Sequence, residues 1–462
     1  MAQVQNAQGA GNMWTDEARA TFKLAWPLVL AQLAQIGLST SDVIMMGWLG
    51  PEFLGAGALA HSFMFFFLIF GMGLVTAVAP MMAKAIGEED EVSVRRTVRQ
   101  GFWVCIAFST IVIPFMLQID HIFLLLGQEP DIAVLAETYA RVGAFQFYPF
   151  LLFAVMRSFL AAHNITMVVL FATLVGIVLN IIGNYGLMFG NFGLPRLELL
   201  GAGISTVIVH SATFLFALFY ALALKRFKDY NLLQRFWKPD WQRFFDVIRV
   251  GVPIGFMLMA EVGMFSVAAF MMGWLSKPEL AAHAIALQIT AISFMVPLGI
   301  SQATTVRVGI CHGRRSPIGV MVAGWTNIAM GVGFMVFTCM LYILFPGFFV
   351  QFFLNPADPE NVAAFNFAVT YIMIAGVFQL VDGGQVMAAA SLRGLSDTKV
   401  PMAIALFGYW VVGIPVGYLL GFVFEWRGIG VWAGMALGLA VVAVLLTIRF
   451  AQRDRLGLVR YG

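Results

Sequence analysis

Three acidic residues stand inside long apolar stretches of this chain, where an ionisable side chain needs an explanation. Glu261 lies near the middle of the apolar run from 250 to 275, and Asp382 and Asp42 lie within two other apolar runs. A charge at the centre of a bilayer costs about 2.5–3.5 kcal/mol on insertion scales, so such residues mark ion or substrate pathways by default. Carboxylates in that setting can exchange a proton or a hard cation such as Na⁺. These three residues are therefore the candidate coupling and substrate sites.

A structural role is the alternative for each acid, since a protonated carboxyl group can serve only as a hydrogen-bond partner between helices. Asp42 also lies near the outer end of its segment, where water could reach it. Glu137 and Arg141 differ from these acids, because residues four apart on a helix can pair with each other. We expect that pair to be structural.

The elements that must position the acids are membrane helices. The chain has 462 residues, of which 61% are hydrophobic and 11% are charged, whereas soluble domains carry about 25% charged residues. The first 17 residues are polar and show no secretory signal. Twelve apolar segments can be marked, roughly at 20–49, 53–83, 98–118, 133–162, 165–190, 199–225, 248–275, 279–304, 318–345, 362–391, 399–421 and 429–450. The composition therefore predicts an all-α polytopic membrane protein.

An internal repeat divides these segments into two sets of six. A shift of 226 residues places Pro27 on Pro253, Gly37 on Gly263 and the run MMGWL at 45–49 on the same run at 271–275. Because each half has an even number of spans, the halves are parallel repeats. We expect two pseudo-symmetric six-helix bundles facing a central cavity: an N-lobe at 20–225 and a C-lobe at 248–450. They are joined by a linker at 226–247 and flanked by tails at 1–19 and 451–462.

Orientation follows from the basic residues. With a cytoplasmic N-terminus, the outer side keeps only Arg196, Lys277 and Arg427, a bias that puts both termini in the cytoplasm. The polar connector from 225 to 249 carries tryptophans and phenylalanines among its charges. It reads either as a helix lying along the membrane surface or as a solvated loop.

Neutral polar residues complete the candidate site. Gln35 falls on Glu261 at the repeat shift, and Asp42 falls on Ala268, so the halves carry acids at different levels. Most buried amides in membrane helices are interhelical hydrogen-bonding groups. Four of them are candidate cavity-lining residues: Gln35, Gln288, Asn180 and Asn184.

Three stretches, in order along the chain, resemble the multidrug and toxic compound extrusion (MATE) transporters of the NorM-like branch: SDVIMMGWLG at 41–50, the seventh apolar segment with Glu261, and QLVDGG at 379–384 with LRGLSDTKVP at 392–401. The resemblance covers about residues 24 to 450. It implies export of organic cations in exchange for Na⁺ or H⁺ through an outward-open cavity. It also implies that Asp42 is the N-lobe acid and that Glu261 and Asp382 bind the coupling cation, as metal ligands if that cation is Na⁺. The companion N-lobe acid of the DinF-like branch is absent, because the fifth span offers Asn180 and Asn184. That favours coupling through the C-lobe.

The expected protein is thus a monomeric multidrug antiporter of a bacterial inner membrane. Its partners are cationic small molecules and the lipid bilayer, without nucleic acid, and no cofactor is expected beyond the coupling Na⁺ or H⁺. A lipid-linked precursor flippase of the same superfamily is the alternative, although it would need a basic cavity for phosphates, and the intramembrane charges here are mainly acidic. An enzyme is not expected, because HExxH, GxSxG and Walker motifs are missing and the histidines are scattered.

Overall fold

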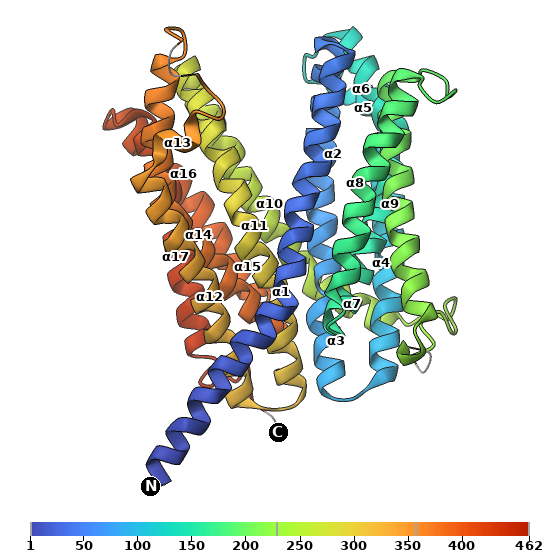
Figure 1. Cartoon of the computed structure of the whole chain (residues 1–462), viewed down its shortest axis with the longest axis vertical. Coiled ribbons are helices and arrows are strands. Elements are labelled where there is room, and N and C mark those ends of the chain that lie inside the picture. The colour runs from blue at the N-terminus through green and yellow to red at the C-terminus, as the bar shows by residue number, and fades with distance from the viewer. Residues whose placement is uncertain (1, 228–229, 356–357, 461–462) are drawn as a thin grey trace. The chain divides into compact units, whose positions relative to one another are not determined.

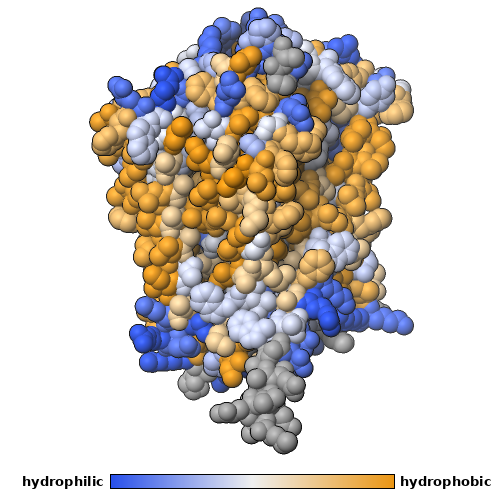
Figure 2. Space-filling view, turned by 60° about the vertical axis from the view of Figure 1, so that its left-hand side comes forward, coloured by the Kyte–Doolittle hydropathy of each residue, from blue (hydrophilic) through white to orange (hydrophobic). Residues whose placement is uncertain are grey.

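A computed structural model describes residues 2–227, 230–355 and 358–460 of the chain. These residues form helices and turns without strands. Twelve helical segments of the described part are long and apolar enough to cross a membrane: Asn12–Leu49, Pro51–Gly87, Glu91–Met116, Pro130–Ala162, Thr166–Phe189, Glu198–Ala223, Trp241–Leu275, Lys277–Gly313, Pro317–Leu344, Val362–Gly394, Lys399–Val423 and Arg427–Ala451. The twelve predicted spans are confirmed, and Figure 2 shows an apolar band between two hydrophilic edges.

The chain forms two compact units (Figure 1). The first unit comprises residues 30–255 and the second comprises residues 1–29 with 256–462. The helices that lie wholly in the first unit are α2 (Pro51–Thr76), α3 (Val78–Gly87), α4 (Glu91–Met116), α5 (Ile119–Leu125), α6 (Pro130–Gly143), α7 (Phe147–Ala162), α8 (Thr166–Phe189) and α9 (Glu198–Ala223). Those wholly in the second unit are α11 (Lys277–Gly313), α12 (Pro317–Leu344), α13 (Pro346–Val350), α14 (Val362–Gly394), α15 (Lys399–Leu406), α16 (Ile414–Tyr418) and α17 (Arg427–Ala451).

Two helices, α1 (Ala2–Leu49) and α10 (Trp241–Leu275), are shared between the units. Each contains an internal proline next to the change of unit, Pro27 in α1 and Pro253 in α10. A proline inside a helix removes one backbone hydrogen bond and favours a bend there. Compact packing thus divides the chain inside two proline-containing helices, while the division of the repeat at residues 226–247 stays a prediction.

Helix ends follow local sequence signals. The Asp90 side chain accepts a hydrogen bond of 2.9 Å from the backbone of Ser93 at the start of α4, and Ser316 caps α12 through the backbone of Gly319 at 3.1 Å. Helix α8 ends at Gly190, whose φ of 75° is the left-handed conformation that glycine adopts without strain.

The centre of the second unit is α14, which packs against α11, α12 and α17. Small residues allow close approach along this helix, since a Cβ at Gly383 would collide with Met335 of α12 and one at Gly394 with Val308 of α11. Of the two glycines that follow Asp382, Gly383 serves close packing, while Gly384 has only ordinary contacts. A buried central helix is therefore the element that carries Asp382.

Of the two readings of the connector, the described residues before α10 support the loop. They form a short 3-10 turn at Lys225–Phe227 and further turns before α10 begins at Trp241. Asn231 and Arg235 adopt positive φ values of 45° and 56°, which interrupt a helix. The carbonyl oxygens of Arg235 and Phe236 accept side-chain hydrogen bonds from α4, so they do not serve a helical ladder.

Candidate functional site

The second unit brings two of the predicted acids together. Glu261 is on α10 and Asp382 is on α14, and both are buried, with 8% and 5% of their surface exposed. The two carboxyl groups are close enough to interact electrostatically. Two adjacent carboxyl groups repel each other when both are charged, which makes the uptake of a proton or cation at the pair favourable. This pair has the composition of an exchange site.

Several polar atoms around the pair lack hydrogen bonds. Among the described residues, one carboxylate oxygen of Asp382, both amide atoms of Gln385 and the hydroxyl of Tyr409 are buried without a partner. Gln385 and Tyr409 nevertheless lie near enough to the acids to influence them. A buried polar atom without a partner is costly, and such atoms in a native fold usually face water, an ion or a ligand. The oxygen atoms of Asp382, Gln385 and Tyr409 suit a hard cation.

The hydrogen bonds of Gln379 fix the part of α14 that carries Asp382. Gln379, about one turn earlier on α14, donates to the carbonyl oxygen of Thr290 at 3.0 Å and to the hydroxyl of Ser293, and it accepts from Thr338 at 3.2 Å. These contacts tie α14 to α11 and α12. Gln379 therefore acts as an interhelical hydrogen-bonding residue, as predicted for most amides, and it fixes the rotation of α14 that presents Asp382.

A π-helical segment supplies residues that sequence reasoning missed. Residues Phe407–Gly413 form a π-helix between α15 and α16, and single π turns are often found at functional sites. Its Trp410 donates a hydrogen bond of 3.2 Å to the carbonyl oxygen of Ala260, next to Glu261. Tyr409 lies near both acids. The only signal in the sequence is the spacing of Gly408 and Gly413, which is too weak to indicate a π-helix.

Arg393 was also missed. It lies eleven residues after Asp382 on α14 and interacts electrostatically with Glu261. An interaction between α14 and α10 has no fixed spacing along the chain, so the sequence alone does not single out Arg393. Glu261 thus has a cation in its own unit.

The first unit contains the third acid, Asp42, which is hydrogen-bonded by two side-chain amides. Asp42 is partly buried, and its Oδ1 accepts hydrogen bonds from the side-chain nitrogens of Asn180 at 3.0 Å and Asn184 at 2.6 Å. Ser41 donates to the Asn180 oxygen at 2.9 Å. The Asn184 oxygen is buried and has no partner in the described part of the chain. Asn180 and Asn184 thus directly contact a predicted site residue.

The two glutamines lie apart from these clusters. Gln288 is exposed on α11, and Gln35 is partly buried on α1. Gln32, about one turn before Gln35, accepts a hydrogen bond of 3.2 Å from Arg157. Their cavity-lining role stays a prediction.

Two apolar surface grooves, one on α8 and α9 and one on α12, α14 and α17, contain none of the predicted acids. Among the described residues, no three His, Cys, Asp or Glu side chains gather as a metal site, so a bound Na⁺ would need neutral oxygen ligands as well.

Known proteins resemble this chain over nearly its whole length. The MatE family profile matches residues 27–186 and 253–419. A probable multidrug resistance protein NorM from Mesorhizobium japonicum is 44% identical over 457 residues, covering 97% of each chain.

Solved structures share the fold at lower identity. The Vibrio cholerae MATE transporter VcmN superimposes with a TM-score of 0.86 at 14% identity, covering 97% of this chain and 99% of that one. A MOP superfamily transporter from Pyrococcus furiosus, described as having a binding pocket of reverse polarity that suggests a different function, superimposes with a TM-score of 0.81 at 19% identity, covering 96% and 97%.

Proposed function

Since the chain belongs to the MatE family, we propose that it is a multidrug efflux antiporter that exports organic cations in exchange for Na⁺ or H⁺. The relatives named as multidrug resistance proteins match nearly the full chain. The observation that carries the exchange mechanism is the buried pair of Glu261 and Asp382, with unpartnered oxygen atoms beside it.

The pair can hold one positive charge at a time. A proton or Na⁺ on the carboxyl groups cancels the charge that would attract a cationic drug, and a bound drug cation opposes entry of the coupling ion. Such mutual exclusion is a positive, unfavourable coupling free energy between the two ligands, which is what exchange requires. Arg393 contributes a standing positive charge near Glu261, so the site is less anionic than two carboxylates alone.

Transport proceeds by alternating access, in which the protein changes between two conformations. Each ligand favours the conformation to which it binds more tightly, so the coupling ion and the drug bias the two units toward opposite states. Asp42 with Asn180 and Asn184 forms a second polar cluster, in the first unit. We assign it an auxiliary role in substrate binding, because it has a single carboxylate.

The membrane setting follows from the twelve apolar helices. We place the chain in a bacterial inner membrane with both termini cytoplasmic, on the strength of its basic residues. A transporter of this family has no need of a catalytic centre.

The sign of the charge at the buried site distinguishes the antiporter from the flippase alternative. The fold alone does not separate these functions, since the Pyrococcus furiosus transporter with a reversed pocket shares it. A phosphate-bearing lipid precursor needs clustered cations, whereas the buried pair here is acidic and Arg393 is one cation beside two carboxylates.

The test uses purified protein in liposomes loaded with a fluorescent organic cation, with Na⁺ and pH gradients applied separately. Dye movement under one gradient identifies the coupling ion. Glu261→Gln and Asp382→Asn should each reduce the rate by at least tenfold, while Glu137→Gln, which removes the carboxylate that faces Arg141 at 3.4 Å, should transport normally. Full transport in both site variants, or no response to either gradient by folded wild-type protein, would overturn the proposal.

A further inference from the structure

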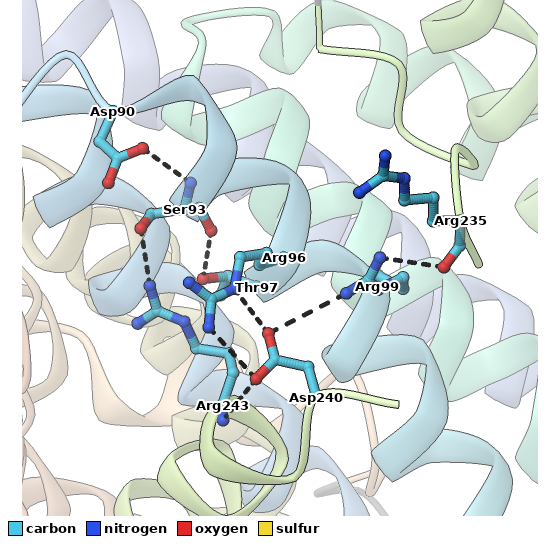
Figure 3. A network of polar contacts seen from close by, with 8 residues as sticks. All are labelled: Asp90, Ser93, Arg96, Thr97, Arg99, Arg235, Asp240 and Arg243. Atoms are coloured by element: carbon cyan, nitrogen blue, oxygen red, sulfur yellow. Dashed lines mark hydrogen bonds and ion pairs between the residues drawn. The ribbon is translucent and has the colours of Figure 1, made fainter. Parts of the chain in front are cut away.

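An arginine cluster joins the start of α4 to the connector in the first unit (Figure 3). We define it as Arg96, Arg99, Arg235 and Arg243, which Figure 3 labels, together with Arg95, which donates to the side-chain oxygen of Gln234 at 3.0 Å. Arg96 forms two hydrogen bonds with Asp240, at 2.6 and 3.2 Å, and Arg99 donates to the carbonyl oxygen of Arg235 at 3.0 Å. Arg243 donates to the Ser93 hydroxyl at 2.9 Å. These contacts position the guanidinium groups on two separate segments of the chain.

Positive charge exceeds negative charge in the arginine cluster. Arg99 interacts electrostatically with three other members, Arg95, Arg96 and Arg235. The carboxylates that act on Arg96 are Asp240, Asp90 and Asp246, fewer than the guanidinium groups of the cluster. Asp240 also caps α10 by accepting from the backbone of Arg243 at 3.3 Å, and the Arg96 hydrogen bond holds its pKa below the ordinary value. The carboxylates are thus already engaged, and a net positive charge remains.

Part of this charge lacks a partner. The Arg99 side chain is 6% exposed, and its Nε atom has no hydrogen-bond acceptor among the described residues. In Figure 3 the guanidinium of Arg235 takes part in none of the contacts drawn, while its backbone oxygen accepts from Arg99. An anion at this position would satisfy donors that the protein leaves open.

Exposed aromatic side chains adjoin the cluster. Trp103, one turn after Arg99 on α4, donates to the carbonyl oxygen of Phe236 at 3.1 Å, and its ring meets that of Trp237 at 5.8 Å. Trp237 is 81% exposed and Trp241 is 64% exposed. Tryptophan is enriched where membrane proteins meet the headgroup region, since its ring is apolar and its N–H is polar. A small soluble anion would not cover these exposed rings, whereas the glycerol and acyl carbons of a lipid would.

We propose that the arginine cluster, with Trp237 and Trp241, is a binding site for the headgroup of an anionic phospholipid. The phosphate accepts hydrogen bonds from the arginines, and the glycerol and first acyl carbons cover the exposed tryptophans. Such a lipid bridges α4 and the connector, so its occupancy stabilises the fold of the connector. The site is outside the acidic pair and does not depend on the exchange mechanism.

Binding of phosphatidylglycerol to detergent-solubilised full-length protein is measured by native mass spectrometry, with phosphatidylcholine as the zwitterionic comparison. The test variant is Arg95→Gln with Arg235→Gln, which leaves the Asp240 contacts in place. The matched control is Arg314→Gln with Arg315→Gln, which removes the same charge from two exposed arginines of the second unit. A charge-assisted hydrogen bond from an arginine to the phosphate strengthens binding by about tenfold or more, and the control arginines form none at this site. The test variant should therefore lose affinity by about an order of magnitude or more, with the control within about twofold of wild type.

Trp237→Ala separates a lipid from a free phosphate. It should weaken phosphatidylglycerol binding while leaving the arginines intact, and an excess of soluble glycerol phosphate should not displace the lipid. Equal losses in the test and control variants would reduce the effect to general surface charge and overturn the proposal. Displacement by glycerol phosphate, unchanged binding in Trp237→Ala, or no preference of the wild type for phosphatidylglycerol would also overturn it.

Discussion

Asn184 donates a hydrogen bond of 2.6 Å to Asp42, while its own side-chain oxygen is buried without a partner in the described part of the chain. The amide thus faces the acid with its donor and leaves its acceptor free. Asn180 makes the second donation at 3.0 Å, and its oxygen is engaged by Ser41. The two asparagines, four residues apart on α8, are consequently not equivalent, and only Asn184 has an acceptor to offer a ligand.

Replacing Asn184 with leucine removes this donor and keeps a similar side-chain size. A hydrogen bond to a charged group contributes about 1.5–3 kcal/mol, so we expect a loss of that order in stability, measured by thermal unfolding in detergent. Asn191→Leu is the control, since Asn191 makes a longer bond of 3.3 Å in an exposed position. Equal melting temperatures of Asn184→Leu and wild type would show that the amide contributes no stability at Asp42.

Gln379→Leu should loosen the packing of α14. The change removes the hydrogen bonds of Gln379 with Ser293, Thr338 and the carbonyl oxygen of Thr290. These groups keep other partners, so the cost is that of the lost hydrogen bonds, about 0.5–1.5 kcal/mol each. We expect a marked fall in melting temperature together with slower dye transport, because Asp382 is one turn away. Gln351→Leu, at an exposed position, is the control. If Gln379→Leu melts like the control, the network does not hold α14.

Glu279 is a buried acid with a purely structural environment. It is fully buried at the start of α11, accepts from Arg427 at 2.7 Å, from the Tyr371 hydroxyl at 2.9 Å and from the backbone of Gly428 at 3.1 Å. Glu279→Gln leaves Arg427 unpaired, although that side chain is half exposed and can be hydrated. We expect a loss of about 1–3 kcal/mol in unfolding free energy.

The matched control for Glu279 is Glu198→Gln. Glu198 begins α9 and pairs with Arg196 at 3.2 Å, but both side chains are substantially exposed. An exposed ion pair contributes about 0–1 kcal/mol, so this variant should unfold nearly as the wild type does. Similar losses in the two variants would mean that burial does not decide the contribution of these acids.

His163 makes stability depend on pH. It lies between two spans and is 4% exposed. Its Nδ1 donates to the Phe159 carbonyl oxygen at 2.8 Å, and the Nε2 of the neutral ring accepts from the Tyr230 hydroxyl at 3.1 Å. Burial lowers its pKa to about 4, against an ordinary value of about 6.5. Between these values the unfolded chain binds a proton that the folded chain does not, so stability is complete above pH 6.5 and falls as the pH drops toward 4.

The measurement compares melting temperatures at pH 7.5 and pH 5. His163→Gln should reduce the loss on acidification relative to wild type, because glutamine does not titrate. His121→Gln, at an exposed histidine that pairs with Asp120, should leave the loss unchanged. An acid-induced loss of the same size in His163→Gln and wild type would assign the pH dependence to other groups.

The amino-acid sequence alone determined the helices and the acids. Twelve apolar runs of membrane length are a property of local composition, and Glu261, Asp382 and Asp42 stand out because a bilayer makes an ionisable residue costly wherever it lies. The ion pair of Glu137 and Arg141 followed equally from helical spacing. These inferences need no knowledge of how helices pack.

Tertiary structure alone decided which polar groups meet. Glu261 and Asp382 are 121 residues apart, and only the packing of α10 and α14 within one unit brings them together with Arg393 and Tyr409. The turns of the connector likewise depend on Arg99 and Trp103, more than 130 residues away. A hydrogen bond or an ion pair depends on distances of a few ångströms between side chains, and a linear pattern of residues contains no such distances until the helices are packed.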